Sequence, residues 1–109
     1  MFEIFQSDKN QKFYFNLKAK NGQIILSSQA YADKSGAKNG IDSVQKNCDD
    51  DSKYERKTAA NGKFHFNLKA GNGQIIGSSQ MYASEAGMEN GIESVKTNSH
   101  HATIKDLTD

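Results

Sequence analysis

Hydrophobic and polar residues alternate strictly in two separate parts of the chain. Residues 13–19 read Phe-Tyr-Phe-Asn-Leu-Lys-Ala, with an apolar residue at every second position, and residues 64–70 read Phe-His-Phe-Asn-Leu-Lys-Ala. A period of two predicts a strand that buries one face. In each part an Asn-Gly pair and a second apolar segment follow, beginning at Ile24 or Ile75. Because Asn-Gly between two such segments is typical of a β-hairpin, we expect one hairpin in each part.

The length of the connecting loop decides which residues of a hairpin lie opposite one another. A two-residue loop at Asn21 and Gly22 gives the first hairpin one apolar face and one mostly polar face. The pairs expected on the apolar face are Ala19 with Ile24, Leu17 with Leu26, and Phe15 with Ser28. The pairs expected on the opposite face are Lys18 with Ile25, Asn16 with Ser27, and Tyr14 with Gln29.

Three more strands and two helices are expected around these hairpins. Residues 2–6 alternate around Glu3, and residues 54–58 are a more polar counterpart, which suits a strand near a sheet edge or with one wet face. Asp33 and Ser84 are good helix N-caps, followed by apolar or small residues at helical spacing. The expected helix stripes are Ala37, Gly40, Ile41, Val44 and Cys48 in the first copy, and Met88, Gly91, Ile92 and Val95 in the second. A short last strand is expected within residues 102–107, around Ile104.

Each helix stripe contains a Gly-x-x-x-Gly spacing, formed by Gly36 and Gly40 in the first copy and by Gly87 and Gly91 in the second. A glycine inside a helix costs about 0.5 to 1 kcal/mol relative to alanine. A membrane helix dimer would need an apolar helix of about 20 residues, which the sequence lacks. We therefore expect the helix backbone to approach the sheet closely at these glycines.

The chain aligns with itself at an offset of 51 residues. Residues 13–47 lie over residues 64–98, and 23 of these 35 pairs are identical, which identifies a tandem duplication. Two units are too few for a solenoid or propeller, which needs about three or more. A unit of about 50 residues without a disulfide or a metal is also marginal alone. We therefore expect a pseudo-two-fold arrangement, in which one chain forms what a homodimer of single units would form.

Composition and charge exclude several classes of protein. With 14 Lys plus Arg against 13 Asp plus Glu, the net charge of +1 offers no attraction for nucleic acid or for an anionic membrane. The longest apolar run is three residues, at 24–26, far below the roughly 18 of a membrane span. The single cysteine cannot form an internal disulfide. We expect a protein of the cytoplasm without a membrane partner.

Three short segments occur twice and in the same order: Asn-Gly-Gln-Ile-Ile, Ser-Ser-Gln-x-Tyr-Ala and Asn-Gly-Ile-x-Ser-Val. In this the chain resembles, over nearly its whole length, the duplicated form of the YegP-like family of small bacterial proteins. The resemblance implies repeated β3-α-β units in one continuous sheet, with the final strand of one unit exchanged onto the other. It implies no substrate and no catalytic residue, because the family has no established activity.

These observations together predict an α+β fold. We expect residues 1–109 to form a single compact domain of two repeats, at about 1–51 and 52–109. The repeats should share one mainly antiparallel sheet around a pseudo-two-fold, with both helices on one face and the final strands exchanged. The chain is expected to be a monomer with this internal pseudo-dimer.

If both helices cover one face of the sheet, the opposite face stays open and is a candidate binding surface. The candidate residues for binding a partner are Tyr14, Asn16, Ser27, Gln29, His65, Asn67, Ser78 and Gln80. The same face is expected to display Lys18, Ile25, Lys69 and Ile76. The alternative interpretation is cross-strand pairing on a solvated face, worth roughly 0.2 to 1 kcal/mol per pair. Base stacking on an RNA-binding sheet is disfavoured, because Phe64 and Phe66 share the face assigned to the core.

The residues that could support metal or catalytic chemistry do not form a recognisable pattern. The histidines are His65, His100 and His101, and the one acidic run is Asp49, Asp50 and Asp51. Neither cluster recurs in the other copy, so we expect solvated loops and no metal site. We expect Cys48 to be a small core residue at a helix end. Nucleophile elbows, phosphate loops and dinucleotide fingerprints are absent from the sequence, and no cofactor is expected.

Two functional hypotheses remain open. The first is a non-enzymatic interaction or binding module that engages a protein, a peptide or a small polar ligand through the open sheet face or a sheet edge. The second is a small-ligand-binding protein or enzyme with a pocket at the pseudo-two-fold, involving Tyr31, Tyr82 or His65. The sequence favours the first, since it contains no visible catalytic machinery.

Overall fold

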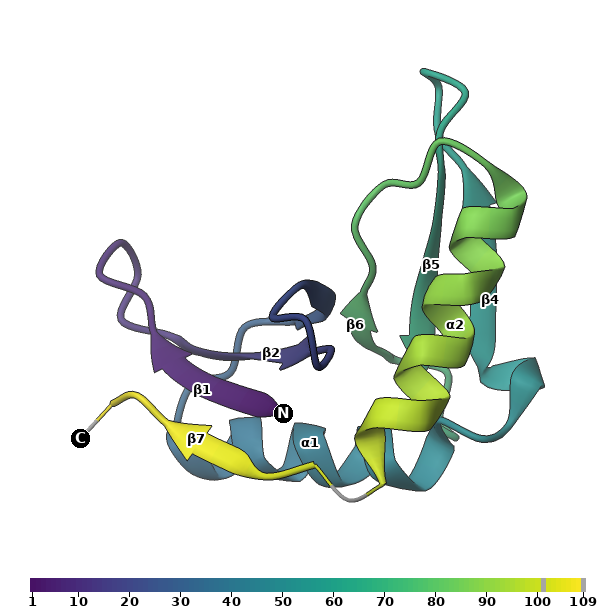
Figure 1. Ribbon diagram of the computed structural model, residues 1–109. Helices are drawn as coiled ribbons and strands as arrows, with labels where there is room; N and C mark the ends of the chain where they lie inside the picture. The colour runs from purple at the N-terminus through teal and green to yellow at the C-terminus, as the bar shows by residue number, and fades with distance from the viewer. Residues whose placement is uncertain (101, 109) are drawn as a thin grey trace.

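Seven strands form one mixed sheet in the computed structural model, which describes residues 1–100 and 102–108 (Figure 1). The first unit consists of β1 (Phe2–Gln6), β2 (Phe13–Lys18), β3 (Ile24–Ser28) and α1 (Lys34–Asn47). The second consists of β4 (Tyr54–Thr58), β5 (Phe64–Lys69), β6 (Ile75–Ser78), α2 (Glu85–Ser99) and β7 (Ile104–Asp106). The expected element order and α+β fold are confirmed.

The order of strands across the sheet is β4-β5-β6-β3-β2-β1-β7. The two units join where β3 and β6 pair antiparallel, with Ser27 opposite Ser78. These two residues are equivalent in the duplication, so the pseudo-two-fold passes through this pair. The expected polar edge strand is β4, which lies at one end of the sheet.

The last strand confirms the exchange between units, but only in one direction. β7 follows α2 of the second unit and pairs in parallel with β1 of the first unit. After α1, in contrast, a short 3-10 turn (Asp51–Lys53) leads directly into β4. Among the described residues, β4 therefore has no strand on its outer side.

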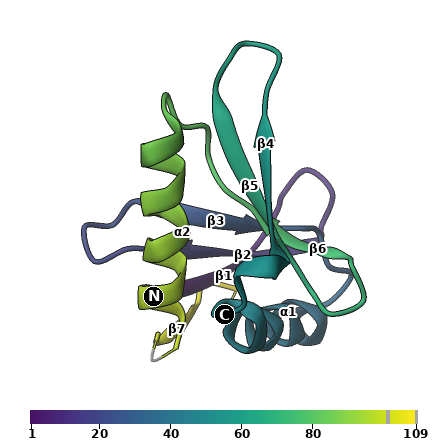
Figure 2. The same ribbon diagram turned by 90° about the vertical axis from the view of Figure 1, so that its right-hand side faces the viewer.

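Both helices lie against strands of both units. α1 contacts β1 and β2 of its own unit and also β5 and β6, while α2 contacts β5 as well as β2 and β3. Figure 2 shows the helices running in different directions over the twisted sheet. The buried apolar residues form one cluster: Phe2, Ile4, Phe15, Leu17, Ile25, Leu26, Ala37, Ile41, Val44, Cys48, Tyr54, Phe66, Leu68, Ile76, Met88, Ile92 and Val95. The hydrophobic core is thus shared, which explains how two marginal units stabilise each other.

The helix starts confirm the caps expected from the sequence. The carboxylate of Asp33 accepts a hydrogen bond from the backbone N–H of Gly36 at 2.7 Å. The hydroxyl of Ser84 accepts the equivalent bond from Gly87 at 3.0 Å. The expected apolar stripes are buried in both helices, and Cys48 is fully buried at the end of α1.

Close packing at the helix glycines is also confirmed, although the closest neighbour is an aromatic ring rather than the sheet backbone. A Cβ added to Gly40 would overlap the Tyr31 hydroxyl and lie 2.7 Å from its Cζ and 2.8 Å from Cε2 of Phe15. The Tyr31 ring stacks on Phe15, with ring centroids 6.2 Å apart. Tyr82 fills the same place beside Gly91 in the second unit. Only a glycine leaves room for these rings.

The hairpin loops differ from the two-residue loop expected from Asn-Gly. Ala19 and Gln23 close a three-residue loop, in which the Gly22 N–H donates to the Ala19 carbonyl and Gly22 has a φ of +85°. Lys18 therefore pairs with Ile24 instead of Ile25. A bulge between Leu17 and Lys18 then restores the expected register, and the predicted pairs Leu17 with Leu26 and Asn16 with Ser27 are confirmed. The second hairpin has the same irregularity.

The bulge corrects one part of the predicted open face. Ile25 and Ile76 were expected on that face, but each is only 5% exposed and belongs to the core. Ile24 and Ile75 are exposed instead. The physical reason is that one extra residue in the strand changes the side on which its neighbours point.

Candidate functional site

A row of polar side chains crosses the open face, which is the face of the sheet opposite the helices. The strand pairing places these residues side by side in the order Lys105, Glu3, Asn16, Ser27, Ser78, Asn67 and Glu55. Four of the residues expected to bind a partner, Asn16, Ser27, Asn67 and Ser78, lie at its centre. The sequence therefore located this row correctly, except for the charged residues at its ends.

The half of the row in the second unit is hydrogen-bonded to itself. The Ser78 hydroxyl donates to the side-chain oxygen of Asn67 at 2.6 Å, and the Asn67 amide donates to the Glu55 carboxylate at 3.0 Å. Lys69 Nζ donates to the other Glu55 oxygen at 2.9 Å. These bonds, from Asn67 first and Lys69 next, hold the pKa of Glu55 below its ordinary value. Asn67 is only 6% exposed, so its amide serves the fold.

The half in the first unit has fewer internal bonds. Lys18 Nζ and the Glu3 carboxylate form an ion pair at 2.9 Å. Asn16 is half-buried, and its side chain makes no hydrogen bond with the described part of the chain, while Ser27 is exposed. The two copies of one residue pattern thus have different environments.

This difference predicts unequal effects of one substitution in the two copies. Asn67→Ala should lower the free energy of unfolding by about 1 to 2 kcal/mol, because it removes a buried amide that hydrogen-bonds both Ser78 and Glu55. Asn16→Ala should change it by no more than about 0.5 kcal/mol, as is usual for such a site. Urea denaturation of both variants measures this. Equal losses would contradict the internal network.

The other predicted residues of the face are scattered. Tyr14 stacks on Phe5 with ring centroids 5.6 Å apart, and its hydroxyl accepts a hydrogen bond from Asn10. His65 is half-buried on β5 opposite Lys57, and its Nδ1 is buried without a hydrogen-bond partner. Gln80 is exposed beyond the end of β6. They do not form one site with the polar row.

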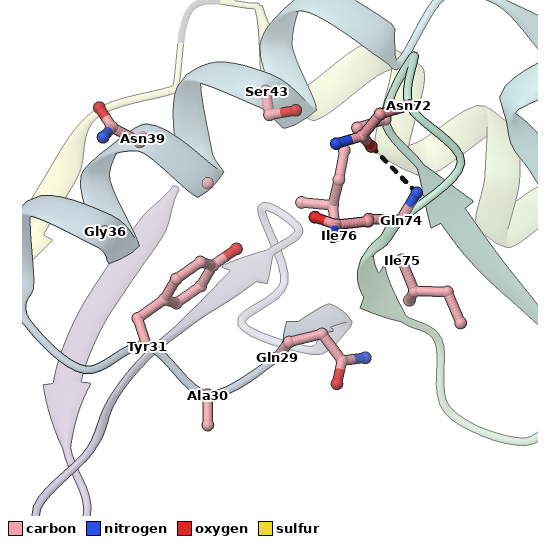
Figure 3. A pocket seen from close by; sticks show the side chains of 12 residues that line it. Gln29, Ala30, Tyr31, Gly36, Asn39, Ser43, Asn72, Gln74, Ile75 and Ile76 are labelled. Carbon is pink, nitrogen blue, oxygen red and sulfur yellow. Dashed lines mark hydrogen bonds between the residues drawn. The ribbon is translucent and has the colours of Figure 1, made fainter.

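A groove with a volume of about 540 Å³ lies between the two units (Figure 3). We call it the inter-unit groove. One wall is α1 with the segment that precedes it, and the other is the β5–β6 hairpin of the second unit. The lining residues are Gln29, Ala30, Tyr31, Gly36, Asn39, Gly40, Ser43, Ala70, Asn72, Gln74, Ile75 and Ile76. Gln29 lies here, and not in a pair with Tyr14 as expected.

The described lining carries no charged side chain and combines amide and hydroxyl groups with apolar side chains. Figure 3 shows the Tyr31 hydroxyl pointing between α1 and the hairpin, with Ser43 and Asn39 on the helix above it. This hydroxyl makes no hydrogen bond with the described residues, and partial burial raises the pKa of Tyr31. It therefore stays a neutral donor and acceptor at physiological pH. The groove can hydrogen-bond a neutral molecule but has no charge with which to bind an ion.

The equivalent hairpin of the first unit borders a different hollow. Ala19, Lys20 and Asn21 line it together with Thr97 and Asn98 of α2, with a volume of about 360 Å³. It carries a lysine where the hairpin beside the inter-unit groove has Gly71. Of the residues proposed for a pocket at the pseudo-two-fold, Tyr31 lines a concave site. His65 lies elsewhere on the sheet.

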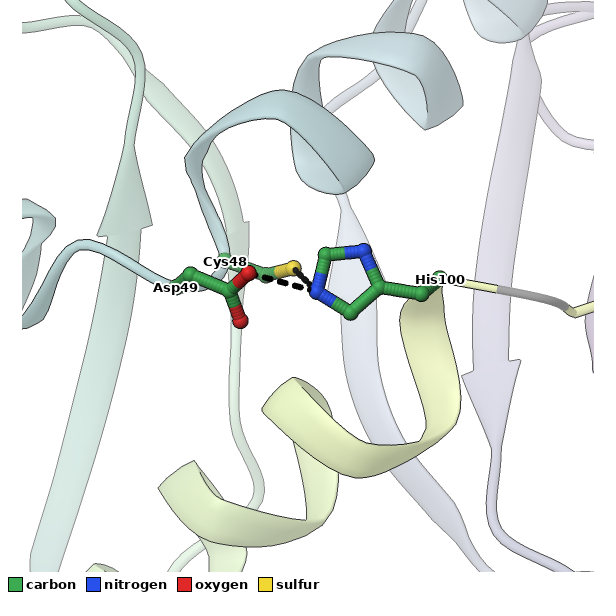
Figure 4. Close-up of side chains that lie close together, drawn as sticks. All are labelled: Cys48, Asp49 and His100. Carbon is green, nitrogen blue, oxygen red and sulfur yellow. Dashed lines mark hydrogen bonds and ion pairs between the residues drawn. The ribbon is translucent and has the colours of Figure 1, made fainter.

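A third cluster joins the ends of the two helices. Cys48, Asp49 and His100 come together, although the sequence predicted solvated loops for Asp49 and His100 (Figure 4). His100 Nε2 lies 2.7 Å from the Asp49 carboxylate and 3.6 Å from Cys48 Sγ. Both side chains lie in exposed turns, as expected, but the fold also brings positions 52 residues apart into contact, which the sequence did not predict. His101 lies outside the described residues.

This cluster does not have the geometry of a cysteine nucleophile with its base. In such a site one ring nitrogen faces the thiol and the other faces the orienting carboxylate. Here the thiol and the carboxylate approach the same nitrogen. Cys48 is also fully buried, and burial together with Asp49 raises the pKa of its thiol. The cluster therefore lacks an activated nucleophile.

The duplication contained a signal for this cluster that sequence reasoning missed. At the repeat offset, position 48 corresponds to Ser99 and position 49 corresponds to His100. Residues that are equivalent in the two units meet where they approach a pseudo-two-fold. That neither the acidic run nor the histidine pair recurs in the other copy does not count against such a contact, because it needs only one residue from each copy.

None of the helices in the described residues is long and apolar enough to cross a membrane. The longer helix, α2, has 15 residues and carries charged side chains along its length.

Comparison with protein families identifies the duplicated pattern. The sequence profile described as "Domain of unknown function (DUF1508)" matches residues 8–55 and again residues 59–106. The chain is 55% identical to the UPF0339 protein in the ptx operon 5′ region of Stutzerimonas stutzeri, over 97% of this chain and 95% of that protein. It is also 55% identical to the UPF0339 protein YegP of Escherichia coli K12, over 98% and 96%.

Two solved structures share the fold along the whole chain. The solution structure of a UPF0339 protein from Shewanella oneidensis has a TM-score of 0.92 at 53% identity, covering 98% of this chain and 90% of that one. The solution structure of YegP from Escherichia coli, titled a protein of unknown function, has a TM-score of 0.93 at 53% identity, with coverage of 98% and 91%. The arrangement of strands and helices is therefore common to these relatives.

Proposed function

Because the chain belongs to the DUF1508 family, whose compared members are named without an activity, we propose from its own geometry that it is a non-enzymatic binding protein for a small uncharged ligand. The ligand is rich in hydroxyl or amide groups and lies in the inter-unit groove. The observation that carries this proposal is the uncharged lining, in which amide and hydroxyl side chains and the Tyr31 hydroxyl lie beside apolar ones.

The size and chemistry of the groove suit such a ligand. A volume of about 540 Å³ lies within the roughly 300 to 1,000 Å³ of small-molecule sites. Amide and hydroxyl side chains of Gln29, Asn39, Ser43 and Gln74 border it beside the apolar side chain of Ile75. Paired donors and acceptors without net charge favour neutral partners, because a buried charge would be left uncompensated.

The groove is preferred to an enzyme site for a chemical reason. Its described lining contains no carboxylate, histidine, lysine or cysteine that could transfer a proton or attack a carbonyl. Tyr31 is its one titratable side chain, and burial holds its hydroxyl in the neutral form. We therefore propose that the groove binds its ligand without converting it.

The test uses the internal repeat as its control. We expect chemical-shift changes on α1 and the β5–β6 hairpin when the 15N-labelled protein is titrated with N-acetylglucosamine, uridine and N-acetylglycinamide, all of them uncharged, in separate series. Tyr31→Phe should weaken binding of the responding probe several-fold, whereas Tyr82→Phe, at the equivalent position, should not. Shift changes confined to other surfaces, or equal effects of the two variants, would contradict the proposal.

The open face is a second candidate site, for a protein or peptide partner. It is favoured by the Asn16 amide, which lacks a partner among the described residues, and by the exposed Ser27 beside it. Asn16→Ala is the variant for this test, because it should leave the fold intact. Unchanged recovery of a cross-linked partner in Asn16→Ala would count against the face.

The proposal places the protein in the cytoplasm as a monomer. A free and reduced Cys48 is compatible with a reducing compartment. The shared core already provides the contacts that a dimer of single units would supply.

A further inference from the structure

The carboxyl-terminal ends of both helices meet at one point of the molecule. Cys48 is the C-cap residue of α1, and His100 is the C-cap residue of α2. Gln45 near the end of α1 donates a side-chain hydrogen bond to the backbone carbonyl of Ser99 at 3.0 Å. This hydrogen bond links the two helix ends directly. It therefore keeps Cys48 and Asp49 close to His100.

Three different metal-ligating atoms converge there. Sγ of Cys48, a carboxylate oxygen of Asp49 and a ring nitrogen of His100 all lie within 4.8 Å of one another. Figure 4 shows the thiol and the carboxylate approaching the same ring nitrogen from neighbouring directions. The Cys48 sulfur also lies 3.6 Å from the backbone carbonyl of Gln45, which helps to fix its position beside the ring nitrogen.

The distances suit a tetrahedral zinc ion. Zn–S and Zn–N bonds of about 2.3 and 2.1 Å place sulfur and nitrogen about 3.6 Å apart at tetrahedral angles. Sγ of Cys48 and Nε2 of His100 are 3.6 Å apart. The Asp49 oxygen, 2.7 Å from the same nitrogen, would have to move outward by about 0.6 Å to reach the spacing of two zinc ligands. Asp49 is exposed, with 66% of its side chain accessible, and can make this movement.

The electrostatic surroundings also favour a cation. A helix carries a partial negative charge at its carboxyl-terminal end, and here two such ends converge. The acidic residues Asp50 and Asp51 follow Asp49 directly, but Lys53, Arg56 and Lys96 already pair with them, so the helix ends supply the attraction. The ring of His100 is partly exposed, with 40% of its side chain accessible, so one ligand of the cluster is open to solvent.

We propose that Cys48, Asp49 and His100 bind one zinc ion, with solvent completing the coordination. Cys48 and Asp49 come from the first unit and His100 from the second, so the ion ties the two units together at their helix ends. Cys, His and carboxylate ligands together are typical of zinc rather than of magnesium or calcium, which prefer oxygen alone. On binding, the thiol proton is released to solvent and the thiolate coordinates the ion.

The experiment is calorimetric titration of the intact protein with zinc chloride, together with cobalt(II) spectroscopy. We expect one ion per chain, a thiolate-to-cobalt charge-transfer band and a higher melting temperature with zinc. Cys48→Ser and His100→Gln should each weaken zinc binding by at least about tenfold. Cys48→Ser introduces the residue that the other copy has at this position, so it should keep the fold.

His65→Gln is the matched control, because His65 lies on β5 outside the cluster and its removal should leave zinc binding unchanged. Three outcomes would overturn the proposal. They are an absence of binding, binding that is equally strong in Cys48→Ser, and a cobalt complex without the thiolate band. The last two would mean that surface histidines alone bind the ion.

Discussion

Phe15→Ala is expected to destabilise the whole protein by about 3 to 5 kcal/mol, the usual cost of removing a buried phenylalanine ring. Phe15 is fully buried, packs edge-on against Phe2 at 5.7 Å between centroids, and stacks on Tyr31. A domain of this kind has a total stability of about 5 to 15 kcal/mol, so the loss is a large part of it.

The same variant tests whether the two units form one cooperative structure. Because the core is shared, we expect resonances of His65 in the second unit and of Tyr14 in the first to disappear at the same urea concentration. Phe5→Ala is the control, since Phe5 lies half-exposed on Tyr14 and should cost much less. A second unit that keeps its original midpoint would show two independent domains instead.

Gly40→Ala is expected to cost about 3 kcal/mol, toward the upper end of the range for overpacked cores. The added Cβ would overlap the Tyr31 hydroxyl and lie 2.8 Å from Phe15, in a site enclosed by two stacked rings. The intrinsic preference of alanine for helices, about 1 kcal/mol, offsets only part of this. Gly91→Ala should cost somewhat less, because its Cβ would lie 3.2 Å from Phe66.

Urea denaturation measures both glycine variants, with Gly71→Ala as the control. A Cβ at Gly71 meets nothing within 4 Å, so this change should stay within about 0.5 kcal/mol of the original stability. Combining Gly40→Ala with Tyr31→Ala should recover part of the loss, because the overlapping ring is then removed. A double variant whose losses simply add would contradict the steric explanation.

Both predictions concern residues whose burial could be predicted from the sequence. The contact that sets the size of the loss in stability could not be predicted from it. The stripes of α1 and α2 and the inward position of Phe15 follow from periodicity, which depends on near neighbours in the chain. The contact of Gly40 with Tyr31 depends on how the segment after β3 folds back against α1. Sequence reasoning therefore assigned the glycine to a close approach without naming its partner.

The candidate sites were predictable to different degrees. The polar row on the open face followed from strand phase, and its central residues Asn16 and Asn67 were identified correctly. Their different environments were not, because identical residues in the two copies give identical predictions. The inter-unit groove was expected only as a pocket beside Tyr31, and its second wall could not be assigned because it comes from the other unit.

The sequence by itself determined the duplication, the strands, the helix caps and the shared family fold. These features depend on local periodicity and on residues a few positions apart. Only the tertiary structure decided where the helix ends meet, which half of the polar row is hydrogen-bonded to itself, and which hairpin faces α1. Pairing of β3 with β6 creates these contacts between residues more than 40 positions apart, and no local preference specifies their geometry.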